Sequence, residues 1–257
     1  MMTAGPLFAL VSDVHGNEQA LRACLADADG RGATQLWCLG DVMGYGARPM
    51  ECLSLLRERG AVMIRGNHEQ AVLDGPFGFN PIAAAAIRWT RARAEAQGSE
   101  PLAYMRALPE RVDAPDATLV HGSPAQPLDE YVFAEDALDN LPHGVDYSPK
   151  LARSFRLIDR PCFIGHTHVP GVIRGDMTWS APSEHEGRFD TRGAPCLVNV
   201  GSVGQSRDGD LRASYALFDG QVVSFRRVEY DVQAAAKDIL TTRALPPVLA
   251  QRLLEGW

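Results

Sequence analysis

The first 70 residues alternate between short apolar runs and helix-like segments, and this alternation constrains the fold more than any other feature. Apolar runs that resemble buried strands occur at 7–12, 34–41 and 61–69. Between them, 18–29 and 49–59 carry apolar residues at helical spacing. A β-α-β-α-β order predicts parallel strands with helical crossovers, and here the third strand is expected to end in a loop. Such sheets place their binding sites at the carboxyl ends of the strands.

The remainder of the chain predicts further α/β structure. Asp219-Gly220 is a good hairpin turn between two β-prone runs, and 127–157 is acidic and interrupted by proline and glycine. Helices are expected at 81–97, 101–108, 232–240 and 246–254. No linker separates independent domains. We therefore expect one domain over 1–257, with cap-like insertions at about 76–110 and 127–157.

Composition excludes some classes of protein. Of the 257 residues, 46% are hydrophobic and 22% are charged, which is typical of a folded chain and not of a disordered one. The formal net charge of −7 argues against a broad electrostatic grip on long nucleic acid or on an anionic membrane.

Five cysteines are scattered without any C-x-x-C spacing, which favours a reducing compartment. The N-terminal segment has no basic region, and its apolar run is too short for a signal peptide or a membrane span, as is every other apolar run. We therefore expect a cytoplasmic location and no membrane partner.

Each expected strand of the sheet ends in residue types that ligate metals. The five clusters are SDVHGN (12–17), LGDVMGYG (39–46), RGNHEQ (65–70), LVHGSP (119–124) and GHTH (165–168). Any one of them could serve as a turn, a helix cap or a satisfied polar group in the core. Five in succession, holding five of the seven histidines, indicate a metal site.

The ligand types narrow the choice of metal. Imidazole, carboxylate and amide oxygen suit Mn, Fe or Zn, and the lack of cysteine in the clusters argues against a thiolate zinc site or an iron–sulfur centre. Asp13 and His15 would point the same way from an extended segment and could hold one ion. The set is too large for one catalytic ion. Two ions about 3.5–4 Å apart that share one carboxylate would use all of it.

The order D-x-H, G-D, G-N-H-[DE], H and G-H-x-H resembles the calcineurin-like metallophosphoesterases. The closer resemblance is to a small bacterial group related to phosphodiesterases and diadenosine tetraphosphatases, through GDVMGYG, HGSP, GHTHVP and NVGSVGQSRD. The resemblance implies a four-layer αββα sandwich, in which helices flank two mixed β-sheets and the metals lie at the sheet ends.

The same resemblance implies roles for individual residues. Asp41 would bridge two metal ions, and His68 would protonate or stabilise the leaving oxygen without binding metal. A metal-bridging hydroxide would attack phosphorus, with no covalent intermediate. The remaining ligands would be Asp13, His15 and His168 for the first ion and Asn67, His121 and His166 for the second.

One departure from the motifs of this superfamily bears on the class of substrate. The phosphoprotein phosphatases of this superfamily carry G-D-x-x-D-R-G, whereas Gly44-Tyr45-Gly46 stands here, so a protein phosphatase role is disfavoured. Arg207 is the leading candidate for a phosphate-binding cation, with Arg65 and Arg212 as alternatives. Asn17 is a further candidate for substrate binding, against a role in turn formation. His143 and His185 lie outside the motifs and are expected at the surface.

Three functions remain in competition. The first is hydrolysis of small phosphomonoesters or phosphodiesters, nucleotides included. The second is a non-catalytic interaction module, as in the retromer subunit that resembles these enzymes. A nuclease for long nucleic acid is disfavoured because no basic and aromatic stripe is present. The intact ligand set with His68 favours the enzyme. The physiological substrate, the resident metals and a homo-oligomeric state are left open.

Overall fold

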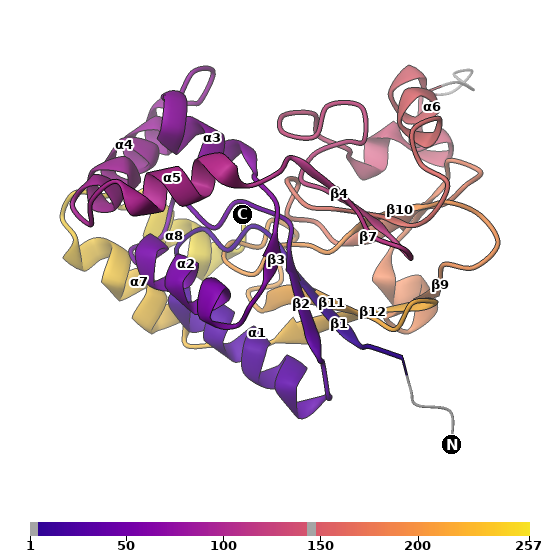
Figure 1. Cartoon of the computed structure of the whole chain (residues 1–257), viewed down its shortest axis with the longest axis horizontal. Helices are drawn as coiled ribbons and strands as arrows, with labels where there is room; N and C mark the ends of the chain where they lie inside the picture. Colours follow the sequence, from indigo (N-terminus) through magenta and orange to yellow (C-terminus); the bar gives the residue numbers. More distant parts are fainter. Residues whose placement is uncertain (1–4, 143–147) are drawn as a thin grey trace.

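Two mixed β-sheets face each other in a computed structural model that describes residues 5–142 and 148–257 (Figure 1). The first sheet has the order β3-β2-β1-β11-β12-β9 and the second has the order β4-β5-β6-β10-β7-β8. The strands of the first are β1 (Phe8–Val11), β2 (Gln35–Cys38), β3 (Val62–Met63), β9 (Arg188–Asp190), β11 (Ala213–Phe218) and β12 (Val222–Val228). Those of the second are β4 (Arg111–Asp113), β5 (Thr118–Val120), β6 (Cys162–Ile164), β7 (Gly171–Ile173), β8 (Trp179–Ser180) and β10 (Leu197–Asn199).

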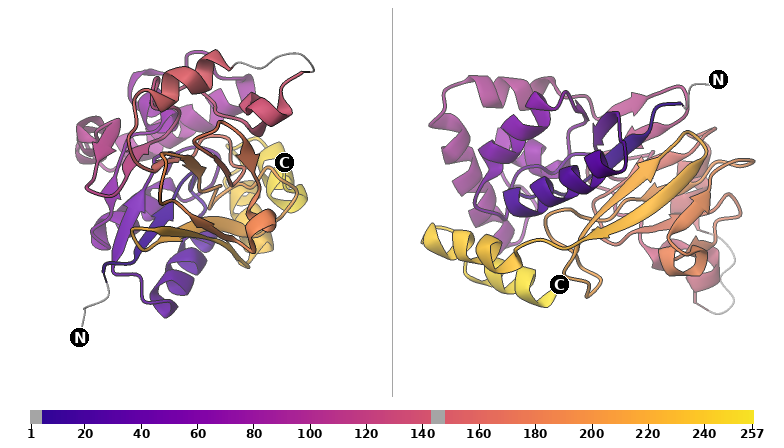
Figure 2. Two further views of the ribbon diagram at one scale, coloured as in Figure 1. Left: turned by 90° about the vertical axis from the view of Figure 1, so that its right-hand side faces the viewer. Right: turned by 90° about the horizontal axis from the view of Figure 1, so that it is seen from below.

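The described residues form eight α-helices and three short 3-10 turns. Figure 2 shows the two C-terminal helices on the same side of the sheets as the N-terminal helices. The helices are α1 (Glu18–Gly30), α2 (Pro49–Glu58), α3 (Asn67–Asp74), α4 (Pro81–Glu95), α5 (Glu100–Ala107), α6 (Pro149–Phe155), α7 (Val232–Thr241) and α8 (Val248–Glu255).

The predicted β-α-β-α-β unit is confirmed at the N-terminus. β1 pairs in parallel with β2, and β2 pairs in parallel with β3. β11 then lies antiparallel to β1, and its hairpin with β12 turns at Asp219-Gly220 as expected. The second sheet likewise contains parallel neighbours, β5 with β6 and β6 with β10.

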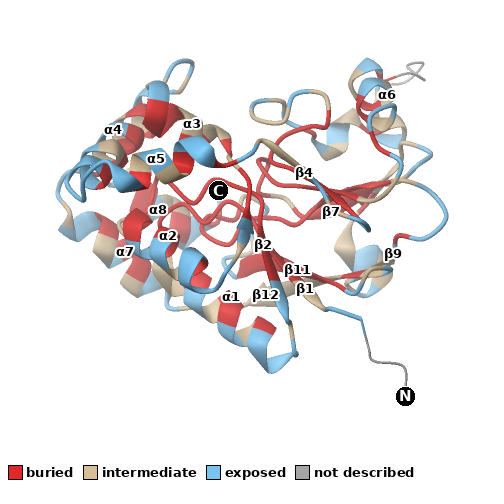
Figure 3. Ribbon diagram, viewed as in Figure 1, coloured by how far each residue is buried: buried red, intermediate tan, exposed pale blue. Residues whose placement is uncertain are grey.

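Separate apolar cores hold the layers together, and Figure 3 shows buried residues on the strands and on the helices. Between the sheets, Leu10 and Trp37 of the first pack with Phe163 and Val198 of the second. A second core joins β1 and β2 to α1 and α2 on the outer face of the first sheet. A third joins β5 and β6 to Leu151 of α6 on the outer face of the second sheet. This order of layers confirms the expected αββα sandwich.

The predicted extent of the third strand is wrong. The strand covers only Val62–Met63, and the segment expected to be a loop begins α3 at Asn67. Glu69 explains the difference because its carboxylate accepts the backbone N–H of Gly66 at 2.9 Å and so caps the new helix. The expected helices at 81–97, 101–108, 232–240 and 246–254 correspond to α4, α5, α7 and α8, with ends that differ by up to two residues.

The acidic segment 127–157 contains two 3-10 turns, at Ala134–Asp136 and Leu138–Asn140, and the short helix α6. His143 lies outside the described residues. His185, expected at the surface, is half-buried and hydrogen-bonded to Ser180. The assignment of one domain with two insertions stays a prediction.

The five cysteines are free and buried. Among the described residues, the helices are all too short or too polar to cross a membrane.

Candidate metal centre

The predicted ligands lie close together where the carboxyl ends of the strands in the two sheets face each other. Each lies just beyond a strand, so the parallel pairs in both sheets deliver their loops to one place. Asp13 and His15 follow β1, Asp41 follows β2, Asn67 begins the helix after β3, His121 follows β5, and His166 and His168 follow β6.

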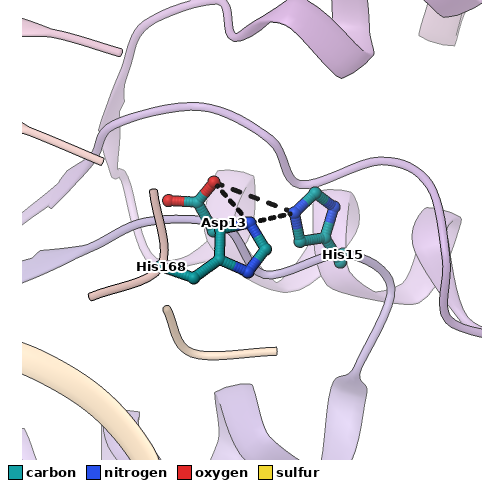
Figure 4. A group of neighbouring side chains, drawn as sticks. All are labelled: Asp13, His15 and His168. Atoms are coloured by element: carbon teal, nitrogen blue, oxygen red, sulfur yellow. Dashed lines mark hydrogen bonds and ion pairs between the residues drawn. The ribbon is translucent and has the colours of Figure 1, made fainter. Parts of the chain in front are cut away.

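Asp13, His15 and His168 form the first group (Figure 4). Nε2 of His168 lies 3.2 Å from Oδ1 of Asp13, and Nε2 of His15 lies 3.8 Å from the same oxygen. The two Nε2 atoms are 3.1 Å apart. Oδ1 of Asp13 is buried and accepts no hydrogen bond from the described residues.

The tautomers of these histidines explain why such a group needs a cation. Nδ1 of His15 lies 2.9 Å from the carbonyl oxygen of Met43, and Nδ1 of His168 bonds the carbonyl oxygen of Gln205. Each Nδ1 therefore donates its hydrogen to a carbonyl, which leaves a lone pair on Nε2. Two lone pairs that face each other beside a carboxylate oxygen repel one another, and a metal ion between them removes the repulsion.

The second group repeats this arrangement with Asp41, His121 and His166. Nδ1 of His121 lies 2.8 Å from the carbonyl oxygen of Leu39, and Nε2 of His166 lies 3.3 Å from that of Asp129. The other two ring nitrogens, Nε2 of His121 and Nδ1 of His166, face each other at 3.1 Å. Oδ1 of Asn67 lies 3.1 Å from the same Nε2 atom.

Asp41 lies between the two groups. Its Oδ2 atom is 3.2 Å from Nε2 of His121 in the second group and 3.9 Å from Nε2 of His15 in the first. The donor set of imidazole, carboxylate and amide oxygens therefore fits divalent metal ions, and Asp41 is the residue that reaches both groups.

Burial keeps three of the ligand imidazoles in the neutral form that can bind a metal ion. It lowers the pKa of His166 to about 3 and lowers the pKa values of His15 and His168, so these rings are neutral at pH 7. Burial also lowers the pKa of His121, but the Asp41 carboxylate raises it more strongly, to about 10. A cation would therefore have to displace a proton from His121. The pKa of Asp41 is held well below its usual range because His121 and His68 outweigh the effect of burial.

The backbone of the ligands differs from expectation. We expected Asp13 and His15 to converge from an extended segment, but both lie in the left-handed region, with φ of 51° and 48°. Asp41, His166 and His168 share this conformation, with φ of 55°, 69° and 65°. Left-handed backbone is costly for residues other than glycine, so the surrounding hydrogen bonds must hold it. Asp13, for example, donates its N–H to the carbonyl of Gly40 and receives a bond at its own carbonyl from Ser202.

His68 lies beside Asp41. Its backbone N–H donates to Oδ1 of Asp41 at 2.8 Å, and its Nε2 atom is 3.9 Å from Oδ2. Its Nδ1 atom is buried, has no hydrogen-bond partner among the described residues, and faces Gly44, where an added Cβ would lie 2.1 Å away. Burial lowers the pKa of His68 to about 4, so the ring at pH 7 is a neutral N–H donor.

A pocket of about 410 Å³ opens beside the ligands, a size that suits a small molecule. Arg207 lines it, as predicted for a phosphate-binding residue, although its role stays a prediction. The lining consists of Asp41, Tyr45, Asn67, His68, Phe77, Gly78, Phe79, Asn80, Ala83, Asp129, Tyr131, His166, His168 and Arg207.

The other candidate substrate residues lie elsewhere. Asn17 is buried outside the lining; its amide oxygen caps α1 and its amide nitrogen donates to the carbonyl of Gly204 and to the hydroxyl of Tyr230. These contacts match the turn-forming role, and substrate binding by Asn17 stays a prediction. Arg65 pairs with Glu110 and Arg212 pairs with Asp210, both outside the lining.

Several pocket residues were not predicted from the sequence. Tyr45, Phe79 and Tyr131 line the pocket although no metal-ligand pattern marks them. Tyr131 stacks on His166 with ring centroids 3.6 Å apart. Tyr45 lies within the motif GDVMGYG, and Tyr131 lies in the acidic segment 127–157 that was expected to be a cap-like insertion. Their positions in the sequence were therefore the only signal that could have pointed to them.

The sheets and the buried histidine and aspartate groups define a metal-binding phosphoesterase fold. Residues 7–221 match the calcineurin-like phosphoesterase superfamily domain, and the chain belongs to this family. It is 35% identical over 260 residues to an uncharacterized protein of Methanocaldococcus jannaschii, covering 97% of this chain and 98% of the other.

Solved structures agree with this assignment. A metallophosphoesterase from Sphaerobacter thermophilus is 36% identical, with a TM-score of 0.82 over 98% of this chain and 100% of the other. A hypothetical protein from Pyrococcus horikoshii shares the fold at 20% identity, with a TM-score of 0.76 over 98% of both chains.

Proposed function

We propose that this chain is a dinuclear metal-dependent hydrolase of small phosphomonoesters or phosphodiesters, nucleotides included. The observation that carries the proposal is the two pairs of facing imidazole nitrogens, with Asp41 between them. Mn and Fe are the expected ions and Zn is an alternative, because the donors are nitrogen and oxygen with no thiolate. Two such ions supply a water-derived nucleophile at neutral pH and neutralise charge on the phosphate.

The chain's own residues would supply the remaining chemistry. Asp13, His15 and His168 would hold one ion, and Asn67, His121 and His166 the other. Arg207, at the pocket wall, would bind a phosphate oxygen as a guanidinium. His68 would donate its Nε2 hydrogen to the leaving oxygen, since this atom faces the Asp41 side of the pocket.

The partners and location follow from the same features. A pocket of about 410 Å³ and a net charge of −7 support a small phosphate ester rather than long nucleic acid or a membrane surface. Five free cysteines support a cytoplasmic location.

Metal analysis and a substrate panel test the proposal. We expect about two transition-metal ions per chain, and hydrolysis of p-nitrophenyl phosphate or bis(p-nitrophenyl) phosphate that stops on chelation and returns on reloading. Activity that survives thorough metal removal would contradict the proposal. A metal-loaded protein without activity on any ester would leave the non-catalytic interaction module as the better explanation.

A further inference from the structure

The pocket has two unlike walls. One is a short aromatic segment between α3 and α4, made by Phe77, Gly78, Phe79 and Asn80. The other carries charged and polar groups, Asp129, Tyr131 and Arg207. A substrate that fills this pocket therefore meets both apolar rings and a cation.

The aromatic wall adjoins His68. The ring of Phe79 meets the ring of His68 edge-on, with centroids 5.2 Å apart and an interplanar angle of 76°. Phe79 also packs against the core beneath the helices, which fixes its position. Phe77 and Phe79 therefore line the pocket beside His68, next to which a group attached to an oxygen at Nε2 of His68 would lie.

Phe77 is the free ring of this wall. The residue is 85% exposed, although it lines the pocket. It stands between Gly75 and Gly78, which have φ of 110° and 80°, a backbone that other residues adopt only with strain. An exposed apolar residue alone needs no explanation, but an uncovered ring at the mouth of a binding pocket offers a stacking surface.

The polar wall does not offer such a surface. Tyr131 stacks on His166, and Phe133 in turn stacks on Tyr131 with centroids 5.1 Å apart and an interplanar angle of 6°. The ring of Tyr131 therefore already stacks on other side chains of the protein. This wall presents charge and hydrogen-bonding groups, which suit the phosphate.

We propose that Phe77 and Phe79 form a leaving-group subsite that takes a flat aromatic ring carried by the alcohol of the phosphate ester. The inference rests on the proposed function, because it takes His68 as the residue at the leaving oxygen. The phosphate lies toward Arg207 and the ring stacks on Phe77. Two kinds of ester share this chemistry: aryl phosphates, and nucleotides whose base reaches the wall across the sugar.

Phosphonates test the subsite without turnover, because their P–C bond is not hydrolysed. On the metal-loaded protein, calorimetry should show phenylphosphonate binding roughly three- to tenfold tighter than methylphosphonate, the range expected for one aromatic contact. Phe77→Ala should bring the two dissociation constants together by weakening phenylphosphonate alone, and Phe77→Trp should keep them apart. Cyclohexylphosphonate, equal in size but not flat, should gain less than phenylphosphonate.

Trp257→Ala is the matched control, since Trp257 is an exposed aromatic residue outside the pocket lining. It should leave every dissociation constant unchanged. A preference for phenylphosphonate that survives Phe77→Ala would overturn the subsite. So would cyclohexylphosphonate binding as tightly as phenylphosphonate.

Hydrolysis distinguishes the two kinds of ester. If the ring is an aryl group, Phe77→Ala should raise KM for phenyl phosphate by roughly three- to tenfold. If it is a nucleobase, the same change should raise KM for adenosine 5′-monophosphate but not for ribose 5-phosphate. Equal KM values before and after the change for all three esters would refute the subsite while leaving the proposed function intact. Absence of turnover for every ester would refute the proposed function, while the phosphonate series would still decide whether Phe77 stacks.

Discussion

The buried carboxylate of Glu69 holds the backbone of Asp41 in place. Its Oε2 atom accepts the N–H of Asp41 at 2.8 Å, and its Oε1 atom accepts those of Val42 and Met43 at 2.8 and 3.0 Å. Oε2 also accepts the N–H of Gly66. One side chain thus joins the loop after β2 to the start of α3, and so fixes Asp41 relative to Asn67 and His68.

Replacing Glu69 with Gln should therefore loosen the centre without removing a ligand. The amide keeps one acceptor oxygen and turns an NH₂ group toward backbone N–H donors, so we expect a loss of roughly 2–4 kcal/mol in the free energy of unfolding. Metal affinity should fall by roughly 10- to 100-fold, as for other residues that orient ligands. Thermal unfolding and metal titration measure these effects. Glu58→Gln is the control because Glu58 is exposed on α2; equal behaviour of the two variants would contradict the assignment.

Asp41→Asn should damage the centre more than the same change at Asp13. Asp41 reaches both ligand groups, whereas Asp13 belongs to one. We expect the metal content to fall from about two ions per chain to about one or fewer for Asp41→Asn, and activity to fall further than for Asp13→Asn. Elemental analysis beside rate measurements checks both values. A rate and metal content near those of the unchanged protein would show that Asp41 does not bridge.

Acid stability should depend on Asp27, which lies on α1 under the first sheet. Tyr215 donates to its Oδ2 atom at 2.7 Å, and Arg31 does so at 3.0 Å. Burial raises the pKa of Asp27, but these bonds and the nearby Arg226 lower it more, so its net pKa lies below the ordinary value of about 3.9. The stabilisation is then fully present above about pH 4 and is lost as the pH falls through the folded-state pKa.

Asp27→Asn should accordingly lower the melting temperature at pH 7 by about 2–4 °C, which corresponds to about 1 kcal/mol for a partly exposed carboxylate in a chain of this size. The difference from the unchanged protein should shrink as the pH falls below about 4. Asp29→Asn serves as the control, because Asp29 pairs with Arg59 in an exposed position on the same helix. A difference that stayed constant down to pH 2 would exclude this linkage.

The sequence predicted the parts of the fold that follow from a local spacing of apolar residues. Apolar spacing found α1 and α2 because a helix buries every third or fourth residue, and the order of strands and helices predicted parallel pairing. It also predicted that the ligand loops meet, since parallel strands deliver their ends to one edge of a sheet. The predicted third strand was too long because it ran on through 64–69, whereas α3 begins at Asn67 and is capped by Glu69.

The geometry of the site depends on contacts between residues far apart in the sequence, and local sequence patterns do not reveal such contacts. The left-handed backbone of the ligands depends on bonds such as that from the N–H of His166 to Oδ2 of Asp13, which joins residues 153 positions apart. The contact of Asn17 with Gly204 could not be predicted either, because the two residues lie 187 positions apart in the sequence. The aromatic wall carried no metal-ligand signal, and it is identified by the residues that line the pocket and by the packing of Phe79 on His68.

The sharpest prediction concerns His68. The structure places its Nε2 atom 3.9 Å from Oδ2 of Asp41, while its ring is held by edge contacts with Tyr45 and Phe79. His68→Ala should leave the metal content intact and lower the rate by roughly 10²–10⁴-fold for esters with poor leaving groups. Esters of acidic phenols should lose much less, because their leaving oxygens need little protonation. A leaving-group series with metal analysis of each preparation measures this difference. If all esters slowed equally, or if the loss followed missing metal, His68 would order the loop rather than assist the leaving oxygen, and the non-catalytic interpretation would regain support.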